Sequence, residues 1–181
     1  MSKLFVDEIQ PKTTGGVINA KNMVIQMPFT QYTGTTQVSI TGGANTSIDV
    51  LSVNITPKST SSIIRLDTHI FHEWSNQHAA YNGVWFFYRD STKLAHAEAG
   101  NRGSGISMST VSYGTVENSS TPEAAYYSYF DSPNTTNQIT YKVGHLNYGT
   151  YTLNINRTGT DADTAQHERG LSFISATEIG G

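Results

Sequence analysis

Histidines and a few clustered acids are the side chains in this sequence that could bind a metal ion or transfer a proton. His69 and His72 are three residues apart in a segment with strand-like alternation, so they point to opposite faces and cannot share one ion. Asp161-Ala-Asp163 offers carboxylates, but calcium takes about six to eight oxygen ligands, and an acidic turn explains the segment better. We therefore predict no metal site, and only an ion on a threefold axis, held by one side chain from each of three copies, stays open.

Catalytic motifs are not found in the sequence. It contains no Gly-x-Ser-x-Gly, no Walker loop and no His-Glu-x-x-His. Gly103-Ser-Gly105 lacks the third glycine of a dinucleotide-binding loop, and no helical pattern follows it. Polysaccharide hydrolysis needs two carboxyl groups at a set distance, and acids are scarce here. We expect no enzyme activity, no catalytic residue and no cofactor.

One loop has the composition of a sugar-binding site. Trp74 and Tyr81 flank the polar residues Asn76 and His78. Flat aromatic faces stack on sugar rings, while amide and imidazole groups form hydrogen bonds with hydroxyls. We predict a candidate receptor or glycan loop at these four residues. The alternative is that Trp74 packs beneath the loop or at a subunit contact.

The composition excludes several classes of partner. Charged residues make up 14% of the 181 residues, the net charge is −3, and no basic run occurs, so nucleic acid is not an expected partner. No apolar run is long enough to span a membrane, and we expect no membrane insertion. Cysteine is absent, which removes disulfides and thiolate sites.

The elements that must position these residues are strands. Short alternating segments recur between Gly, Asn, Ser and Pro, and their spacing predicts an all-β antiparallel sandwich or barrel. Residues 62–72 are the clearest strand, with Ile64, Leu66, Thr68 and Ile70 on one face. In residues 48–55 the alternation slips after Val50, which indicates a bulge or the true start of the strand. An Asn82-Gly83 hairpin turn is expected to join two further strands, 78–81 and 84–88. The other expected strands are 23–29, 37–40, 93–96, 109–116, 124–130, 138–143, 150–155 and 171–179.

Two of these strands carry apolar residues on both faces, which is unusual for a sandwich. In residues 84–88, Trp85 and Phe87 oppose Val84, Phe86 and Tyr88. In residues 124–130, aromatic side chains again alternate to both sides, with Tyr127 and Tyr129 on one of them. We predict a subunit interface at Trp85, Phe87, Tyr127 and Tyr129; the alternative is an extra loop lying across the sheet.

Residues 1–22 read as an extended arm ahead of the domain formed by residues 23–181. The apolar residues Leu4, Phe5, Val6 and Ile9 form a short strand-like run, which Pro11 and Gly15-Gly16 end. Asp7 and Glu8 interrupt the run too early for a secretory signal. We predict that the four apolar residues dock on a partner protein by strand addition.

Three segments resemble structural proteins of tailed phages, especially marine podoviruses and cyanophages. Residues 2–17 resemble the opening of such chains, residues 53–66 a turn between two of their jelly-roll strands, and residues 171–179 their last strand. Together they cover about a third of the chain, and their order is more specific than any one of them. The resemblance implies a jelly-roll β-sandwich similar to trimeric C1q-like or tumour-necrosis-factor-like domains.

The function implied by this resemblance is that of a non-enzymatic virion protein, assembled in the host cytoplasm. It would be a homotrimeric fibre, spike or knob that is anchored to other virion proteins of the tail, portal vertex or capsid by its arm. It would contribute to host attachment, with a host surface glycan as a possible partner. Two alternatives stay open: a capsid decoration, or cement, protein, and a stand-alone carbohydrate-binding module.

Overall fold

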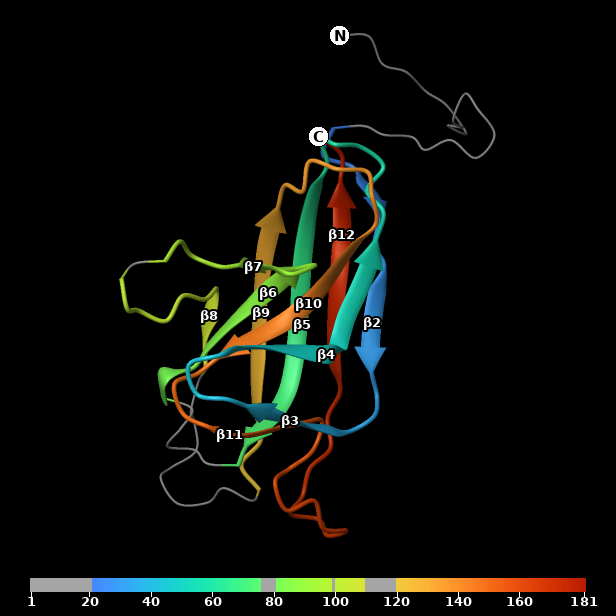
Figure 1. Ribbon diagram of the computed structural model, residues 1–181. Coiled ribbons are helices and arrows are strands. Elements are labelled where there is room, and N and C mark those ends of the chain that lie inside the picture. The colour runs from blue at the N-terminus through green and yellow to red at the C-terminus, as the bar shows by residue number, and fades with distance from the viewer. Residues whose placement is uncertain (1–20, 76–80, 99, 110–119) are drawn as a thin grey trace, which may run out of the picture.

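The computed structural model describes residues 21–75, 81–98, 100–109 and 120–181. Within these ranges it contains twelve β-strands and no α-helix (Figure 1). Every strand pair is antiparallel. The strands form two sheets that pack face to face, which confirms the predicted all-β antiparallel sandwich.

The larger sheet has seven strands and contains both ends of the described chain. Its members are β1 (Val24–Gln26), β2 (Phe29–Tyr32), β3 (Thr36–Ile40), β5 (Ile63–Trp74), β9 (Glu123–Asp131), β11 (Tyr151–Ile155) and β12 (Ser172–Ile179). β12 pairs with β1, β2 and β5, and β5 pairs in turn with β9 and β11. The first strands of the domain thus lie beside the last.

The smaller sheet has five strands. Its members are β4 (Asn45–Ile55), β6 (Val84–Arg89), β7 (Thr92–Leu94), β8 (Ser107–Met108) and β10 (Ile139–Leu146). β10 lies between β4 and β6, and β6 also pairs with β7 and β8. Strands distant in the sequence therefore pair in both sheets, and this order is that of a jelly roll.

The core lies between the two sheets, and β5 shows how the sequence builds it. Ile64, Leu66, Thr68 and Ile70 are all fully buried, as the alternation predicts. Each apolar side chain of this size stabilises the fold by about 1.5–3 kcal/mol when it leaves water. The residues between them point to the opposite face of the sheet, which no other layer of the described chain covers.

The irregularity predicted in residues 48–55 is a bulge. Lys142 of β10 pairs with Ser52, whereas the next residue, Val143, pairs with Ile48. Asp49, Val50 and Leu51 are thus left without partners in the register, and β4 bends there. Because the bulge changes the phase, both Ile48 and Leu51 are fully buried in the core.

Other sequence predictions need correction. Residues 23–29 form two strands instead of one, since Pro28 separates β1 from β2. The Asn82-Gly83 hairpin is wrong, because Val84 at the start of β6 pairs with Leu146 of β10 on one edge and with Met108 of β8 on the other. β6 instead forms a hairpin with β7 through a two-residue turn at Asp90-Ser91, where Asp90 has a positive φ of 52°. Residues 78–80 of the strand expected at 78–81 lie outside the described residues. Most of the strand expected at 109–116 lies outside the described residues.

The two ends of the described chain meet at one end of the sandwich. The Asn22 amide donates to the Gly180 carbonyl at 2.7 Å, and the Gly180 amide donates to the Met23 carbonyl at 2.9 Å. Nearby, the buried carboxylate of Glu178 accepts hydrogen bonds from Gln26, from the Lys58 amide and from Ser62. The start of the domain is therefore fixed to its last strand (Figure 1).

Candidate functional site

The surface of the seven-stranded sheet that faces away from the core exposes several aromatic side chains, and we call it the outer face. Tyr126 and Phe130 of β9 are 62% and 60% exposed, and Phe29 of β2 is 63% exposed. Phe173 of β12 and His69 of β5 lie on the same surface and are half-buried. Single exposed apolar residues are ordinary, whereas several on one face of a sheet make that face a candidate interaction surface.

The strand register places three of these residues in one row. His69 is directly opposite Tyr126 on one side and Phe173 on the other, so three rings cross three strands in one row. The rings of His69 and Phe173 are stacked, with centroids 6.2 Å apart and 22° between their planes. His69 is further held by a hydrogen-bond contact of 3.1 Å between its Nδ1 and the Leu171 carbonyl oxygen.

A second row on the outer face combines charge with an aromatic ring. Arg65 pairs with Phe130, and its guanidinium carbon lies 6.0 Å from the centroid of that ring. Arg65 also forms an ion pair of 2.9 Å with Asp67 on the same strand. The outer face is thus amphipathic: aromatic surface supplies buried area on contact, and the charged pair supplies a fixed polar feature.

The interface predicted at Trp85, Phe87, Tyr127 and Tyr129 is placed wrongly. Trp85 and Phe87 are fully buried in the single chain, and Tyr127 is buried between the sheets with its hydroxyl donating to the Phe86 carbonyl oxygen at 2.9 Å. Tyr129 is partly buried and packs against the same core. Trp85, Phe87 and Tyr127 fill the interior of the chain itself, so these three offer no surface to a second copy.

The second apolar face of β6 is covered by its neighbours within the smaller sheet. Phe86 points away from the core and is nevertheless fully buried. The Lys93 ammonium lies 4.5 Å from its ring centroid, and Tyr88 contacts the ring edge. Gly144 of β10 makes room for the ring, since a Cβ there would lie 2.3 Å from it. Apolar residues on both sides of β6 therefore need no partner chain to explain them.

The glycan loop predicted from the sequence also needs correction. Trp74 is buried in the core and contacts Trp85, Tyr151 and His145, so it presents no face to a sugar. The alternative, that Trp74 packs inside the protein, is the one observed. Tyr81 is half-exposed. Asn76 and His78 lie outside the described residues, as do the four predicted anchor residues Leu4, Phe5, Val6 and Ile9.

Two histidines are buried in the same aromatic cluster. Their burial lowers the pKa of His72 to about 4 and that of His145 to about 3, because a charged imidazolium would lose its hydration there. His145 Nε2 lies 3.0 Å from Ser109 Oγ. At neutral pH both rings are uncharged members of the core. They have the surroundings of structural groups and lack access to a substrate.

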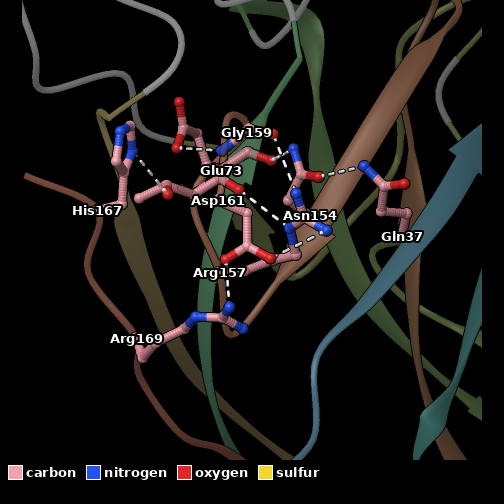
Figure 2. Close-up of polar contacts among 9 residues, drawn as sticks. Gln37, Glu73, Asn154, Arg157, Gly159, Asp161, His167 and Arg169 are labelled. Carbon is pink, nitrogen blue, oxygen red and sulfur yellow. Dashed lines mark hydrogen bonds and ion pairs between the residues drawn. The ribbon is translucent and has the colours of Figure 1, made fainter. Parts of the chain in front are cut away.

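Figure 2 shows a polar network that joins the end of β5 to the segment after β11. Glu73 is buried, and its carboxylate accepts hydrogen bonds from the Gly159 amide at 2.8 Å and from the Thr121 hydroxyl at 3.2 Å. Asn154 donates to the Glu73 carbonyl oxygen and accepts from Gln37. The carboxylate is thus used to hold backbone in place.

The acidic turn predicted at Asp161-Ala-Asp163 is part of the same region. Asp161 forms ion pairs with Arg157 at 3.3 Å and with Arg169 at 2.5 Å (Figure 2). Its carboxylate is therefore engaged by two guanidinium groups. Across the parts of the chain that the structure describes, no group of three or more His, Asp or Glu side chains could hold a metal ion.

Two comparisons with known proteins found no match. No protein-family model matches the chain, and no curated protein matches it at a significant level. In the described ranges no helix is long and apolar enough to cross a membrane. The outer face is therefore the candidate functional site on the evidence of its own residues.

The outer face is not evident from the sequence, because alternation does not say which side of a strand with two apolar faces is covered. Tyr126 and Tyr127 are adjacent and chemically alike, yet one is exposed and the other buried. The usable signal was in β5, where Arg65, Asp67 and His69 mark the solvent side. Pairing β5 with β9 would have placed Tyr126 and Phe130 on that same side.

Proposed function

We propose that this chain is a non-enzymatic structural protein of a phage virion, which forms a homotrimeric fibre, spike or knob. The exposed aromatic outer face carries the proposal, because a subunit that displays such a surface gains stability when copies of itself cover it. The jelly-roll sandwich fits this role. The three segments that resemble tailed-phage proteins supply the virion assignment.

The N-terminal arm would connect the trimer to the particle. The domain begins at the end of the sandwich where β1 and β12 meet, so residues before it start from that end (Figure 1). An arm extending from one end of the sandwich leaves the sheets free to pair with other copies. The arm would add a strand to another virion protein through Leu4, Phe5, Val6 and Ile9.

Deletion of residues 2–16 tests the virion assignment. We expect purified particles to lose the protein, while the isolated deletion variant keeps the mass of the full-length oligomer in light scattering. Unchanged incorporation into particles would contradict the anchor. A monomeric mass for both forms would contradict the trimer.

The number of copies in each particle separates a tail or vertex component from a decoration protein. A handful of trimers per particle, measured by quantitative mass spectrometry of purified virions, supports the proposed fibre, spike or knob. Dozens of copies would indicate a capsid decoration protein, in which the same arm fastens shell subunits.

A further inference from the structure

A groove on the smaller sheet has the lining of a saccharide site. Its volume is about 420 Å³, and it lies between the start of β4, the end of β10 and the segment that joins β7 to β8. This joining segment extends away from the two sheets (Figure 1). The side chains that matter are Asn45, Lys93, Glu98, Asn101, Arg102 and Tyr148.

Tyr148 provides an exposed aromatic surface in this groove. The side chain is 53% exposed, and its hydroxyl lies 3.5 Å from the Asn101 carbonyl oxygen. A Cβ built on Gly103 would lie 3.5 Å from the Tyr148 ring, so the joining segment passes along the ring in ordinary contact. The partly negative face of such a ring attracts the partly positive C–H groups of a sugar.

The backbone around Tyr148 is held firmly by a neighbouring turn. The Gly43 amide donates to the Asn147 carbonyl oxygen at 2.7 Å, and the Gly42 amide donates to the Thr150 hydroxyl at 3.0 Å. Asn147 is itself buried, and its side-chain oxygen accepts from the Gly149 amide at 2.8 Å. A ring presented on two interlocked turns loses little freedom when it binds a ligand.

The charges in the groove favour an anionic ligand. Two cationic side chains, Lys93 and Arg102, line the groove beside the carboxylate of Glu98. The Lys93 ammonium donates to the Asn45 side-chain oxygen at 3.1 Å. Partial burial lowers the pKa of Lys93, so its ammonium has lost hydration that an anion would replace.

We propose that this groove binds a carboxylated saccharide, such as a uronic acid unit of a surface polysaccharide. The sugar ring stacks on Tyr148, its carboxylate meets Lys93 and Arg102, and its hydroxyls form hydrogen bonds with the Asn45 and Asn101 side chains. The groove is open, so a single site binds in the range of about 1 mM, and several copies per particle raise the avidity. The inference rests on the proposed role as a virion fibre, spike or knob, and it moves the glycan site from the loop predicted by the sequence to this groove.

The test is a titration of the isotope-labelled full-length protein with tri-galacturonate, followed by backbone amide shifts. We expect saturable shifts confined to residues 43–45, 93, 100–104 and 148. Tyr148→Ala should weaken binding about tenfold or more, and Lys93→Met about threefold or more. Methionine keeps an aliphatic side chain over Phe86, so the second variant removes the charge while the Phe86 ring stays covered.

Two matched variants control for loss of any tyrosine or lysine. Tyr81→Ala removes a ring of similar exposure, 52%, that does not line the groove, and Lys58→Met removes an exposed lysine near the chain ends. Both should bind tri-galacturonate as the original protein does. Equal weakening by these controls would overturn the groove as the site.

Several results would overturn the proposal. No saturable shift with tri-galacturonate would do so, as would equal affinity for the neutral trisaccharide maltotriose. Equal binding of inorganic phosphate would show a simple anion site instead of a saccharide site. The binding test and the virion test can fail independently. If the protein is present in particles but does not bind tri-galacturonate, only this inference is contradicted. If it binds tri-galacturonate but is absent from particles, only the virion assignment is contradicted.

Discussion

At the scale of single residues, the buried histidines make the stability of the fold depend on pH. The pKa of His72 is about 4 and that of His145 about 3, against 6.5 in the unfolded chain. Below about pH 6.5 the unfolded state therefore binds protons that the folded state does not. The free energy of unfolding should be level above neutral pH and should fall as the pH drops through 6.5 toward 4.

The free energy of unfolding should fall by roughly 2 kcal/mol for each of the two histidines between about pH 7 and pH 5. Urea unfolding at the two pH values measures it. His96→Asn, which alters an exposed histidine, should leave the loss unchanged. An unfolding free energy that stays constant over this range would show that the two rings are not buried in neutral form.

The ion pair between Arg89 and Asp131 is a second residue-scale feature, because it joins the two sheets. The Asp131 carboxylate is nearly buried and accepts from the Arg89 guanidinium at 2.9 and 3.1 Å. It also accepts from the Tyr141 hydroxyl at 2.7 Å, and burial together with this carboxylate raises the pKa of Tyr141. Two donor groups, Arg89 Nη1 and the Tyr141 hydroxyl, thus hold one carboxylate through three contacts at the edge of the core.

Arg89→Met should lower the free energy of unfolding by about 2–4 kcal/mol, because it leaves a nearly buried carboxylate without its cation. Lys142→Met is the matched control. Its partner Asp49 is largely exposed, so its loss should cost less than about 1 kcal/mol. Chemical denaturation compares the two variants. Equal effects would mean that the cross-sheet pair contributes no more than a surface pair.

At the scale of elements, Glu73 fastens the segment after β11 to the end of β5. Glu73→Gln replaces one acceptor oxygen by a donor, and one of the two contacts from Gly159 and Thr121 then loses its acceptor. We expect a loss of about 1–3 kcal/mol and faster hydrogen exchange at the Gly159 amide. Amide exchange measured by NMR tests this, with the Ala176 amide, which donates to the Pro28 carbonyl, as an internal reference. Unchanged exchange at Gly159 would show that other contacts hold this segment.

Elements with one polar face could be predicted from the sequence, and elements with two apolar faces could not. In β5 the charged residues Arg65 and Asp67 alternate with Ile64 and Leu66, so the buried side is explicit. In β6 both sides are apolar. Lys93 of β7 covers Phe86, and the ring fits against β10 because Gly144 has no side chain. These contacts depend on pairing between strands, which alternation within one strand does not record.

The same limit applies to the site at the scale of the whole molecule. The sequence predicts an aromatic interface, but Trp85, Phe87 and Tyr127 belong to the core. Trp85 and Tyr126 differ in role only because β6 turns its tryptophan toward the other sheet, whereas β9 turns its tyrosine away from it. The packing of the two sheets against each other determines which aromatic residues stay exposed. Those that stay exposed on the larger sheet form the outer face.

The outer face provides the prediction that tests the quaternary structure. Tyr126→Glu should convert the proposed trimer into folded monomers, since a carboxylate would have to enter the contact between copies without a partner. Light scattering gives the mass, and circular dichroism checks the fold. Tyr148→Glu, with similar exposure on the smaller sheet, should leave the trimer intact.

Phe87→Glu completes the comparison between core and surface. Phe87 is fully buried against Tyr127, with ring centroids 4.8 Å apart, so a charge at this position should unfold the subunit instead of separating subunits. A trimer that persists in Tyr126→Glu would contradict the outer face as the interface. Folded monomers from Phe87→Glu would instead support the interface on β6 that the sequence predicts.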